Sequence, residues 1–190
     1  MPRPPTLPVL DWKEIFDKGT DWQAWLNNAE SAEQAGKMRE RFDKYPVPQN
    51  VQECLQKLAR PVHVVAIAED WCGDVVRHAP VIARIAESSP QVKLRFITRA
   101  DRPDVFARFL TNGGEAIPKF VFLNSDFVEC GNWGPMPSTP RQFIARGKAI
   151  GDVAAGRAKV REFYAADEAC ETAYRELCDL VQLAGATSID

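Results

Sequence analysis

The sequence lacks the clustered, even set of cysteines that a secreted disulfide scaffold uses. Its five cysteines stand far apart, at positions 54, 72, 130, 170 and 178, which favours a reducing, cytoplasmic setting. Apolar runs are also short, and none approaches the roughly 20 residues that cross a bilayer. The formal net charge of −2 lacks the basic excess that is typical of nucleic-acid binders. These absences predict a protein that binds neither membrane nor nucleic acid.

Metal and phosphate sites are not indicated either. The chain has only two histidines, no Cys, His and acid spacing of a zinc site and no glycine-rich phosphate loop, so we expect no metal and no cofactor. His63 begins an apolar run that leads to Cys72, about 30 Å away at roughly 3.3 Å per residue. His78 falls on the apolar face of an expected helix, so it is interpreted as a core histidine rather than the base of a Cys-His pair.

Proline crowds the N-terminus, where four of the first eight residues are proline. No apolar segment of a secretory signal is present there, and such a leader is expected to be extended and stiff. Helical patterns follow it. One helix is expected from Asp11 to a stop at Gly19, a longer one from Asp21 to about Phe42, and a third near residues 51–58.

Strand patterns occupy the middle of the chain. The expected elements, in order, are a strand over 62–68, a helix over 73–88, a strand over 92–98, a short helix over 103–111, and a hairpin of strands over 118–123 and 127–130. The strand–helix–strand unit should form a right-handed crossover with parallel strands, whereas a hairpin is antiparallel. A loop over 131–138 then leads to helices, of which the last is expected over 157–184. This order predicts a mixed, four-stranded α/β sheet covered by helices.

Several residues stand at fixed places relative to these elements. They are Trp71-Cys72-Gly73 after the first strand, Pro80 eight residues after Cys72, Ile117-Pro118 before the third strand, and Gly134 after the hairpin. In this order they resemble the thioredoxin superfamily, which carries a thiol at the start of this helix, a kinking proline inside it and a cis proline that faces the thiol. The run Glu69-Asp70-Trp71-Cys72-Gly73-Asp74 is similar to a bacterial thioredoxin-like subgroup that often lacks the second active-site cysteine.

The resemblance implies a thioredoxin-like α/β fold with helical extensions at both ends. The expected limits are 1–60 for the N-terminal extension, 61–150 for the thioredoxin-like core and 151–190 for the C-terminal extension, packed as one domain. Cys72 is the candidate catalytic residue. The candidate substrate groove, along which an extended partner backbone can pair, comprises Trp71, Gly73, Asp74, Ile117, Pro118, Trp133 and Gly134.

Three positions depart from the thioredoxin pattern. Val75 stands where the second cysteine belongs, Asp74 where thioredoxins usually carry proline, and Ala66 where they bury an aspartate that moves protons. Each departure removes part of the dithiol mechanism, so ordinary thioredoxin activity is not expected.

The charges around Cys72 act in opposite directions. Unpaired N–H groups at a helix N-terminus favour the thiolate, whereas nearby acidic residues raise a thiol pKa. The acidic neighbours are Glu69, Asp70 and Asp74, and the basic residues expected at the same sheet edge are Arg99, Arg102 and Lys119. The sequence leaves the net shift open.

Two function classes fit these residues. In the first, the protein is a monothiol thiol–disulfide oxidoreductase: Cys72 attacks a protein disulfide or an S-thiolated protein, and an external thiol resolves the mixed disulfide because Val75 cannot. In the second, the protein is a catalytically inactive binding or adaptor module with a vestigial Cys72. A third option, iron–sulfur ligation by Cys72 and an external thiol, lacks recognisable residues to hold that thiol. Cys130 is the only other cysteine near the predicted site, and is expected to be a buried strand residue.

Overall fold

A mixed sheet forms the centre of the computed structural model, which describes residues 9–189. The proline-rich leader predicted for residues 1–8 lies outside the described part. The sheet order is β2-β1-β3-β4, with β1 (Val62–Ile67), β2 (Val92–Ile97), β3 (Lys119–Leu123) and β4 (Glu129–Trp133). β1 is parallel to β2 and antiparallel to β3, and β3 and β4 form an antiparallel hairpin. The predicted mixed four-stranded sheet is therefore confirmed.

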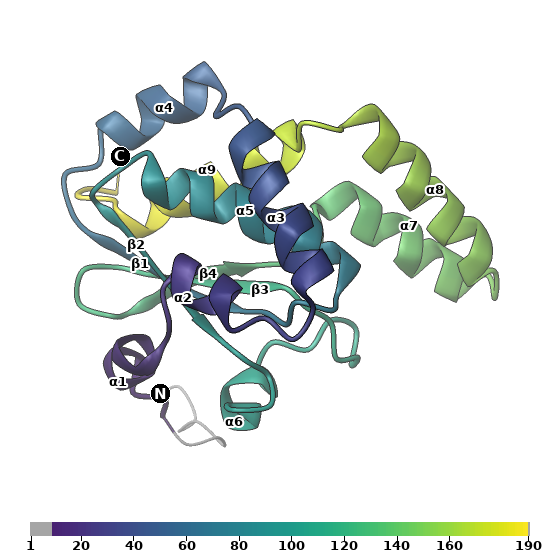
Figure 1. Cartoon of the computed structure of the whole chain (residues 1–190), viewed down its shortest axis with the longest axis horizontal. Coiled ribbons are helices and arrows are strands. Elements are labelled where there is room, and N and C mark those ends of the chain that lie inside the picture. The colour runs from purple at the N-terminus through teal and green to yellow at the C-terminus, as the bar shows by residue number, and fades with distance from the viewer. Residues whose placement is uncertain (1–8, 190) are drawn as a thin grey trace.

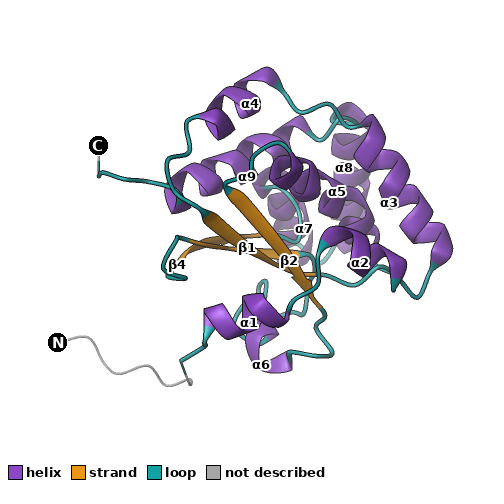
Figure 2. Ribbon diagram, turned by 60° about the vertical axis from the view of Figure 1, so that its left-hand side comes forward, coloured by secondary structure: helices purple, strands orange, loops and turns teal. Residues whose placement is uncertain are grey.

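Helices cover both faces of this sheet (Figure 1). Their bounds are α1 (Trp12–Lys18), α2 (Trp22–Asn27), α3 (Ala32–Lys44), α4 (Gln49–Gln56), α5 (Gly73–Glu87), α6 (Pro103–Phe106), α7 (Ser138–Ala149), α8 (Val153–Ala166) and α9 (Glu171–Ala184). Figure 2 shows α1 and α6 on one face, with α3, α5 and α9 on the other. The sheet is thus a middle layer, and its two central strands, β1 and β3, are mostly apolar and buried because both of their faces are covered.

The single helix predicted from Asp21 to about Phe42 is wrong: the segment forms two helices, α2 and α3. Asn28 ends α2. The backbone N–H of Ser31, the N-cap of α3, donates to Asp70 Oδ2 at 2.7 Å. A carboxylate from a distant loop thus takes a donor that an unbroken helix would use within itself.

The helix predicted over 157–184 is also two helices, α8 and α9. The Arg77 guanidinium donates to the backbone carbonyls of Tyr164 and Asp167, and so caps the end of α8. Cys170 then adopts a left-handed φ of 59°, which interrupts helical geometry. Both misplaced boundaries have the same cause, because a side chain from elsewhere in the chain satisfies the helix end.

Two boundaries in the central region differ as well. The helix expected over 103–111 is only the short α6, because the chain beyond it passes into turns and Asn112 has a positive φ of 50°. β4 extends into the loop expected over 131–138, since Trp133 pairs with Phe120 and stacks on its ring at a centroid distance of 5.4 Å. The longer hairpin brings the segment after β4 beside the segment before β3.

An aromatic row crosses the sheet beneath the start of α5. Ala66 in β1 has Phe96 and Phe120 as its cross-strand neighbours, and these three residues are at most 1% exposed. Trp25 stacks on Phe96 at 4.6 Å, and Trp133 stacks on Phe120 at the other end of the row. Such burial of large rings dominates core energetics, and it leaves the position of Ala66 wholly apolar.

Candidate functional site

Cys72 is the N-cap of α5, directly after the loop that leaves β1. Its carbonyl accepts the N–H of Val76 at 2.9 Å and so begins the helix. Its half-buried thiol donates to the carbonyl oxygen of Ile117, with Sγ and oxygen 3.4 Å apart. The Ile117–Pro118 bond is cis, as the resemblance implies. The fold therefore joins the cysteine loop to the segment that precedes β3.

The pKa of the Cys72 thiol is raised. Burial is the largest cause, and the negative charges of Asp74 and Glu69 add to it. The backbone N–H groups of Val75 and Asp74 lower the pKa but do not prevail. The sequence left this balance open, and the structure resolves it in favour of the protonated thiol at neutral pH.

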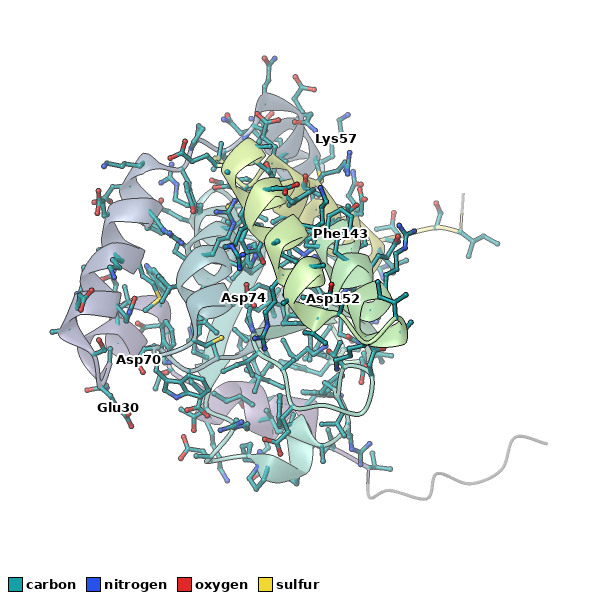
Figure 3. The ribbon with its side chains drawn as sticks, turned by 90° about the vertical axis from the view of Figure 1, so that its right-hand side faces the viewer. Glu30, Lys57, Asp70, Asp74, Phe143 and Asp152 are labelled. Carbon is teal, nitrogen blue, oxygen red and sulfur yellow. The ribbon has the colours of Figure 1, made fainter. Side chains whose placement is uncertain are left out.

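The two acidic residues of the preceding loop face different neighbours. Glu69 accepts the backbone N–H of Arg99 at 3.1 Å and the indole N–H of Trp71 at 3.2 Å, so it ties the loop to the end of β2. Asp70 is buried and accepts from Ser31. Figure 3 shows it near Glu30, away from Asp74. Asp70 is not among the leading causes of the raised thiol pKa, and its carboxylate anchors α3.

Asp74 belongs to a hydrogen-bonded chain that includes the C-terminal helices. Its Oδ1 accepts the hydroxyl proton of Tyr164 at 2.8 Å, and the Tyr164 oxygen lies 3.3 Å from His78 Nε2. Because the tyrosine proton is already donated, His78 must carry its own proton on Nε2. Burial raises the pKa of Asp74, although Tyr164 and Arg77 oppose this.

His78 is a buried core residue, in agreement with the prediction, and is 1% exposed. Burial lowers its pKa well below the ordinary value, so the ring is neutral. Its Nδ1 has no partner among the described residues. The ring contacts Trp133 edge-on at a centroid distance of 5.1 Å. Since Nε2 is engaged with Tyr164, His78 does not serve as the base for Cys72.

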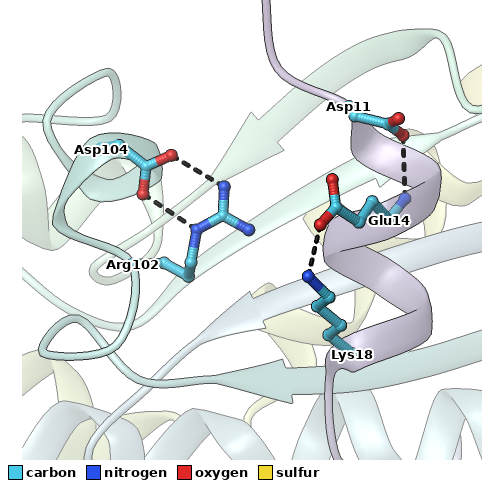
Figure 4. Close-up of polar contacts among 5 residues, drawn as sticks. All are labelled: Asp11, Glu14, Lys18, Arg102 and Asp104. Atoms are coloured by element: carbon cyan, nitrogen blue, oxygen red, sulfur yellow. Dashed lines mark hydrogen bonds and ion pairs between the residues drawn. The ribbon is translucent and has the colours of Figure 1, made fainter.

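The basic residues expected at this edge differ in position. Arg99 contacts the acidic Glu115 at 2.9 Å and lies 5.7 Å from the ring of Trp71. Arg102 forms a double hydrogen bond with Asp104 and faces α1 rather than the thiol (Figure 4). The expectation that Arg102 offsets the acids around Cys72 is therefore wrong.

Lys119 is buried beside the site rather than exposed on it. Its Nζ donates to Thr111 Oγ1 at 2.6 Å and to the Gly134 carbonyl at 2.9 Å. Burial, with a smaller contribution from Arg141, lowers its pKa to about 8. This lysine cross-links the two loops that border the thiol, and no contact joins it to Cys72.

A cleft of about 390 Å³ opens at Cys72. Of the predicted groove residues it is lined by Trp71, Asp74 and Ile117. Its further lining includes Met136, Arg141, Ile144, Lys148, Val153 and Arg157. Sequence reasoning missed this wall from α7 and α8. The signal was the seven-residue spacing of Arg141 and Lys148, which places both on one face of a helix.

Four predicted groove residues, Gly73, Pro118, Trp133 and Gly134, do not line this cleft. Trp133 is 3% exposed and donates its indole N–H to Glu176 at 2.7 Å. Gly134 has a φ of 123°, and a Cβ there would lie 2.0 Å from the Pro118 carbonyl oxygen. The backbone of Gly134 thus packs directly against the cis-proline segment.

No partner thiol lies beside Cys72. Val75 and Ala66 are fully buried apolar residues. Cys130 is half-buried in β4, where its thiol contacts the Val128 carbonyl. It lies three residues before Trp133, the end of β4 next to the cis-proline segment, which is a separation of roughly 10 Å along the strand. The other cysteines, 54, 170 and 178, are buried, and all five are free.

Within residues 9–189, no three His, Cys, Asp or Glu side chains gather as a metal site requires. In the same part of the chain, no helix has both the length and the apolar character to cross a membrane.

Comparison with known proteins gives the family. A family model described as Thioredoxin matches residues 19–149, from α2 to α7. A protein of unknown function from Pseudomonas aeruginosa has a similar structure, with a TM-score of 0.72 and 20% identity over 92% of this chain and 98% of that one. An HIV epitope-scaffold gives a TM-score of 0.68 and 18% identity over 94% of this chain and 100% of its own. No curated protein matches. With its thioredoxin-like α/β fold, the chain belongs to the thioredoxin family.

Proposed function

We propose that this protein is a monothiol thiol–disulfide oxidoreductase with Cys72 as its catalytic residue. The observation that carries the proposal is a half-buried thiol at the start of α5, on an open cleft and in contact with the Ile117–Pro118 segment. Val75 occupies the position from which a second thiol would resolve the intermediate. Trp71, Asp74 and Ile117 form the near wall of the proposed substrate groove.

The reaction proceeds by two thiolate attacks. The Cys72 thiolate attacks one sulfur of a protein disulfide or an S-thiolated protein, an S–S bond to Cys72 forms, and the old S–S bond breaks. Its electron pair leaves on the displaced sulfur, which takes up a proton. An external thiolate then attacks the mixed disulfide and releases Cys72 as a thiolate. Five free cysteines support a reducing, cytoplasmic location for this chemistry.

The protein positions the thiol and only partly offsets the cost of burying its thiolate. The Ile117 carbonyl holds the thiol toward the cleft, and the N–H groups of Asp74 and Val75 stabilise the anion. The raised thiol pKa makes the thiolate scarce at neutral pH. The rate of attack should therefore rise about tenfold per pH unit until the thiol is titrated.

The raised pKa also favours the second function class, a thioredoxin-fold adaptor without turnover. In that case partners bind at the cleft beside Ile117, and the chemical state of Cys72 does not matter. Binding partners that are retained after Cys72→Ala would support the adaptor. Loss of those partners when the thiol is blocked would contradict it.

Trapping of the mixed disulfide tests the oxidoreductase. The protein is incubated with bis(2-hydroxyethyl) disulfide between pH 6 and 10, and adducts are assigned by mass spectrometry. We expect an adduct at Cys72 that is absent in Cys72→Ser, with half-buried Cys130 as an internal reference. If Cys72 gains no adduct at any pH, or reacts no faster than a small free thiol of similar pKa, the proposal fails.

A further inference from the structure

The wall of the Cys72 cleft that α7 and α8 supply is positively charged. Arg141 and Lys148 from α7 and Arg157 from α8 line the same cleft as the thiol. None of these three forms an ion pair within residues 9–189. Arg141 donates only to the Gly134 carbonyl, at 3.2 Å, and neither Lys148 nor Arg157 has a side-chain hydrogen bond in the described part of the chain. Three cationic groups therefore face this cleft without counterions.

The acidic groups of the cleft do not balance this charge. Asp74 accepts the hydrogen bond of Tyr164, and Glu115 is paired with Arg99 at 2.9 Å. Basic charge accumulates here even though the whole chain carries a formal net charge of −2. A cleft lined by one sign of charge concentrates ligands of the opposite sign.

The basic wall is held in place by close helix packing. A Cβ at Gly147 in α7 would lie 2.7 Å from the Asp152 carbonyl, and one at Gly156 in α8 would lie 2.7 Å from the Phe143 carbonyl. The two helices therefore touch through their backbones, and they lie side by side in Figures 1 and 3. Such a rigid wall presents its charges without first having to be ordered.

The remaining surface of the cleft is apolar and small. Trp71 is 52% exposed at its mouth, and Met136, Ile144 and Val153 line its side. Its volume of about 390 Å³ falls in the lower range of small-molecule sites. This suits a short peptide better than a folded protein surface.

Resting on the proposed function, we propose that the cleft binds a small thiol of about tripeptide size with at least two carboxylates, and that this is the external thiol that resolves Cys72. Its carboxylates contact Arg141, Lys148 and Arg157, and its sulfur lies at Cys72 Sγ. When Cys72 has taken the R–S group from an S-thiolated protein, and the protein has left as a thiol, this R group occupies the cleft as Cys72–S–S–R. A second thiolate R–S⁻ from solution then attacks the sulfur of the bound R group. The new bond gives R–S–S–R, and the electron pair of the broken bond returns to Cys72 Sγ.

Charge-matched disulfides test this inference. Glutathione disulfide (anionic), bis(2-hydroxyethyl) disulfide (neutral) and cystamine (cationic) are each reacted with the protein. The rate of Cys72 with each disulfide is divided by the rate of a small free thiol with the same disulfide. We expect normalised rates to fall in that order, with glutathione disulfide at least tenfold above cystamine and the difference reduced by salt. In Arg141→Gln/Lys148→Gln/Arg157→Gln the glutathione disulfide rate should fall about tenfold, the sum of three solvent-accessible charge contacts.

The control is Arg146→Gln/Arg161→Gln, which removes exposed charges from the same two helices but outside the cleft lining. It should leave the glutathione disulfide rate unchanged. Equal normalised rates for the three probes, or equal losses in both variants, would overturn the inference while the proposed function stands. If the neutral disulfide also fails to react, the proposed function falls as well.

A binding measurement separates recognition from reaction. Calorimetry with S-methylglutathione on Cys72→Ser should give binding that the triple variant in the same background weakens about tenfold. Absence of binding to Cys72→Ser overturns the inference, whatever the exchange rates.

Discussion

The hydroxyl of Tyr164 donates to Asp74 Oδ1 at 2.8 Å, and so joins α8 to the first turn of α5, the helix that Cys72 caps. Tyr164 lies beyond residues 19–149, the part that matches the family model. The resemblance to thioredoxins places Asp74 where a proline is usual. Asp74 and the C-terminal extension are therefore joined directly, because the extension supplies a hydrogen-bond donor to this half-buried carboxylate.

Removal of the Asp74 charge should make Cys72 more acidic. Asp74 is a named cause of the raised thiol pKa, and Asp74→Asn keeps an oxygen that accepts from Tyr164. We expect the alkylation midpoint of Cys72 to move to lower pH, and the rate at pH 7 to rise severalfold. The measurement is iodoacetamide alkylation against pH, with sites assigned by mass spectrometry.

Asp70→Asn is the matched control. Its carboxylate accepts from Ser31 and is not among the leading causes of the raised thiol pKa. This variant should leave the alkylation midpoint of Cys72 in place. Equal shifts in both variants would mean that Asp74 acts on the fold in general and not on the thiol.

The sequence predicted local features well and tertiary ones poorly. The four strands, α5 and the Cys72 and Ile117–Pro118 pair follow from apolar periodicity and motif order, which are local. The helix breaks near Ser31 and Asp167 depend on Asp70 and Arg77, partners from distant parts of the chain. No local pattern shows such a partner, because it is set by how the elements pack.

The site divides in the same way. Its near wall was predicted because it lies on the cysteine loop and the segment before β3. The basic wall was missed because α7 and α8 reach the cleft only through tertiary packing. The net pKa of Cys72 was likewise undecided, since burial, its largest cause, depends on the folded surroundings.

Val75→Cys should restore a dithiol pair. The residue lies three positions after Cys72 on α5 and is fully buried, so the second thiol would sit at the spacing that thioredoxins use. We expect an intramolecular disulfide under mild oxidation and measurable disulfide reductase activity, at a stability cost of about 1 kcal/mol. Thiol counting before and after reduction checks this. Val76→Cys, at a residue that is also buried but one position further along, should form no such disulfide.

The free energy of unfolding should fall as the pH drops below about 6.5, the pH at which an unperturbed histidine titrates. Burial depresses the pKa of His78 in the folded state, so the unfolded chain binds a proton near pH 6.5 that the folded chain rejects. The contribution is fully present above this pH and is lost below it, at up to about 1.4 kcal/mol per pH unit. Urea unfolding at pH 7 and pH 5 measures the loss.

His78→Gln isolates this contribution. The glutamine amide keeps an N–H donor for Tyr164 but does not titrate, so its pH dependence should be shallower between pH 7 and 5. Asp74 acts in the opposite sense, because its folded pKa is raised and its protonation at low pH favours the folded state. An unchanged slope in His78→Gln would assign the acid sensitivity to other groups.

Gly134→Ala should destabilise the fold and disturb the thiol together. A Cβ at this position would lie 2.0 Å from the Pro118 carbonyl oxygen, on a backbone with a φ of 123°. Both the clash and the strained φ act here, so we expect the free energy of unfolding to fall by about 2 kcal/mol or more.

Gly113→Ala is the control, since it has a φ of 74° but nothing within 4 Å of the new Cβ. Its loss should be about 1 kcal/mol, from backbone strain alone. Urea unfolding measures both variants, and Cys72 alkylation reports on the site. Pro118 follows Ile117, whose carbonyl accepts from the Cys72 thiol, so only Gly134→Ala should alter the alkylation rate of Cys72. Equal effects of the two variants would show that Gly134 is needed for its φ and not for its contact with Pro118.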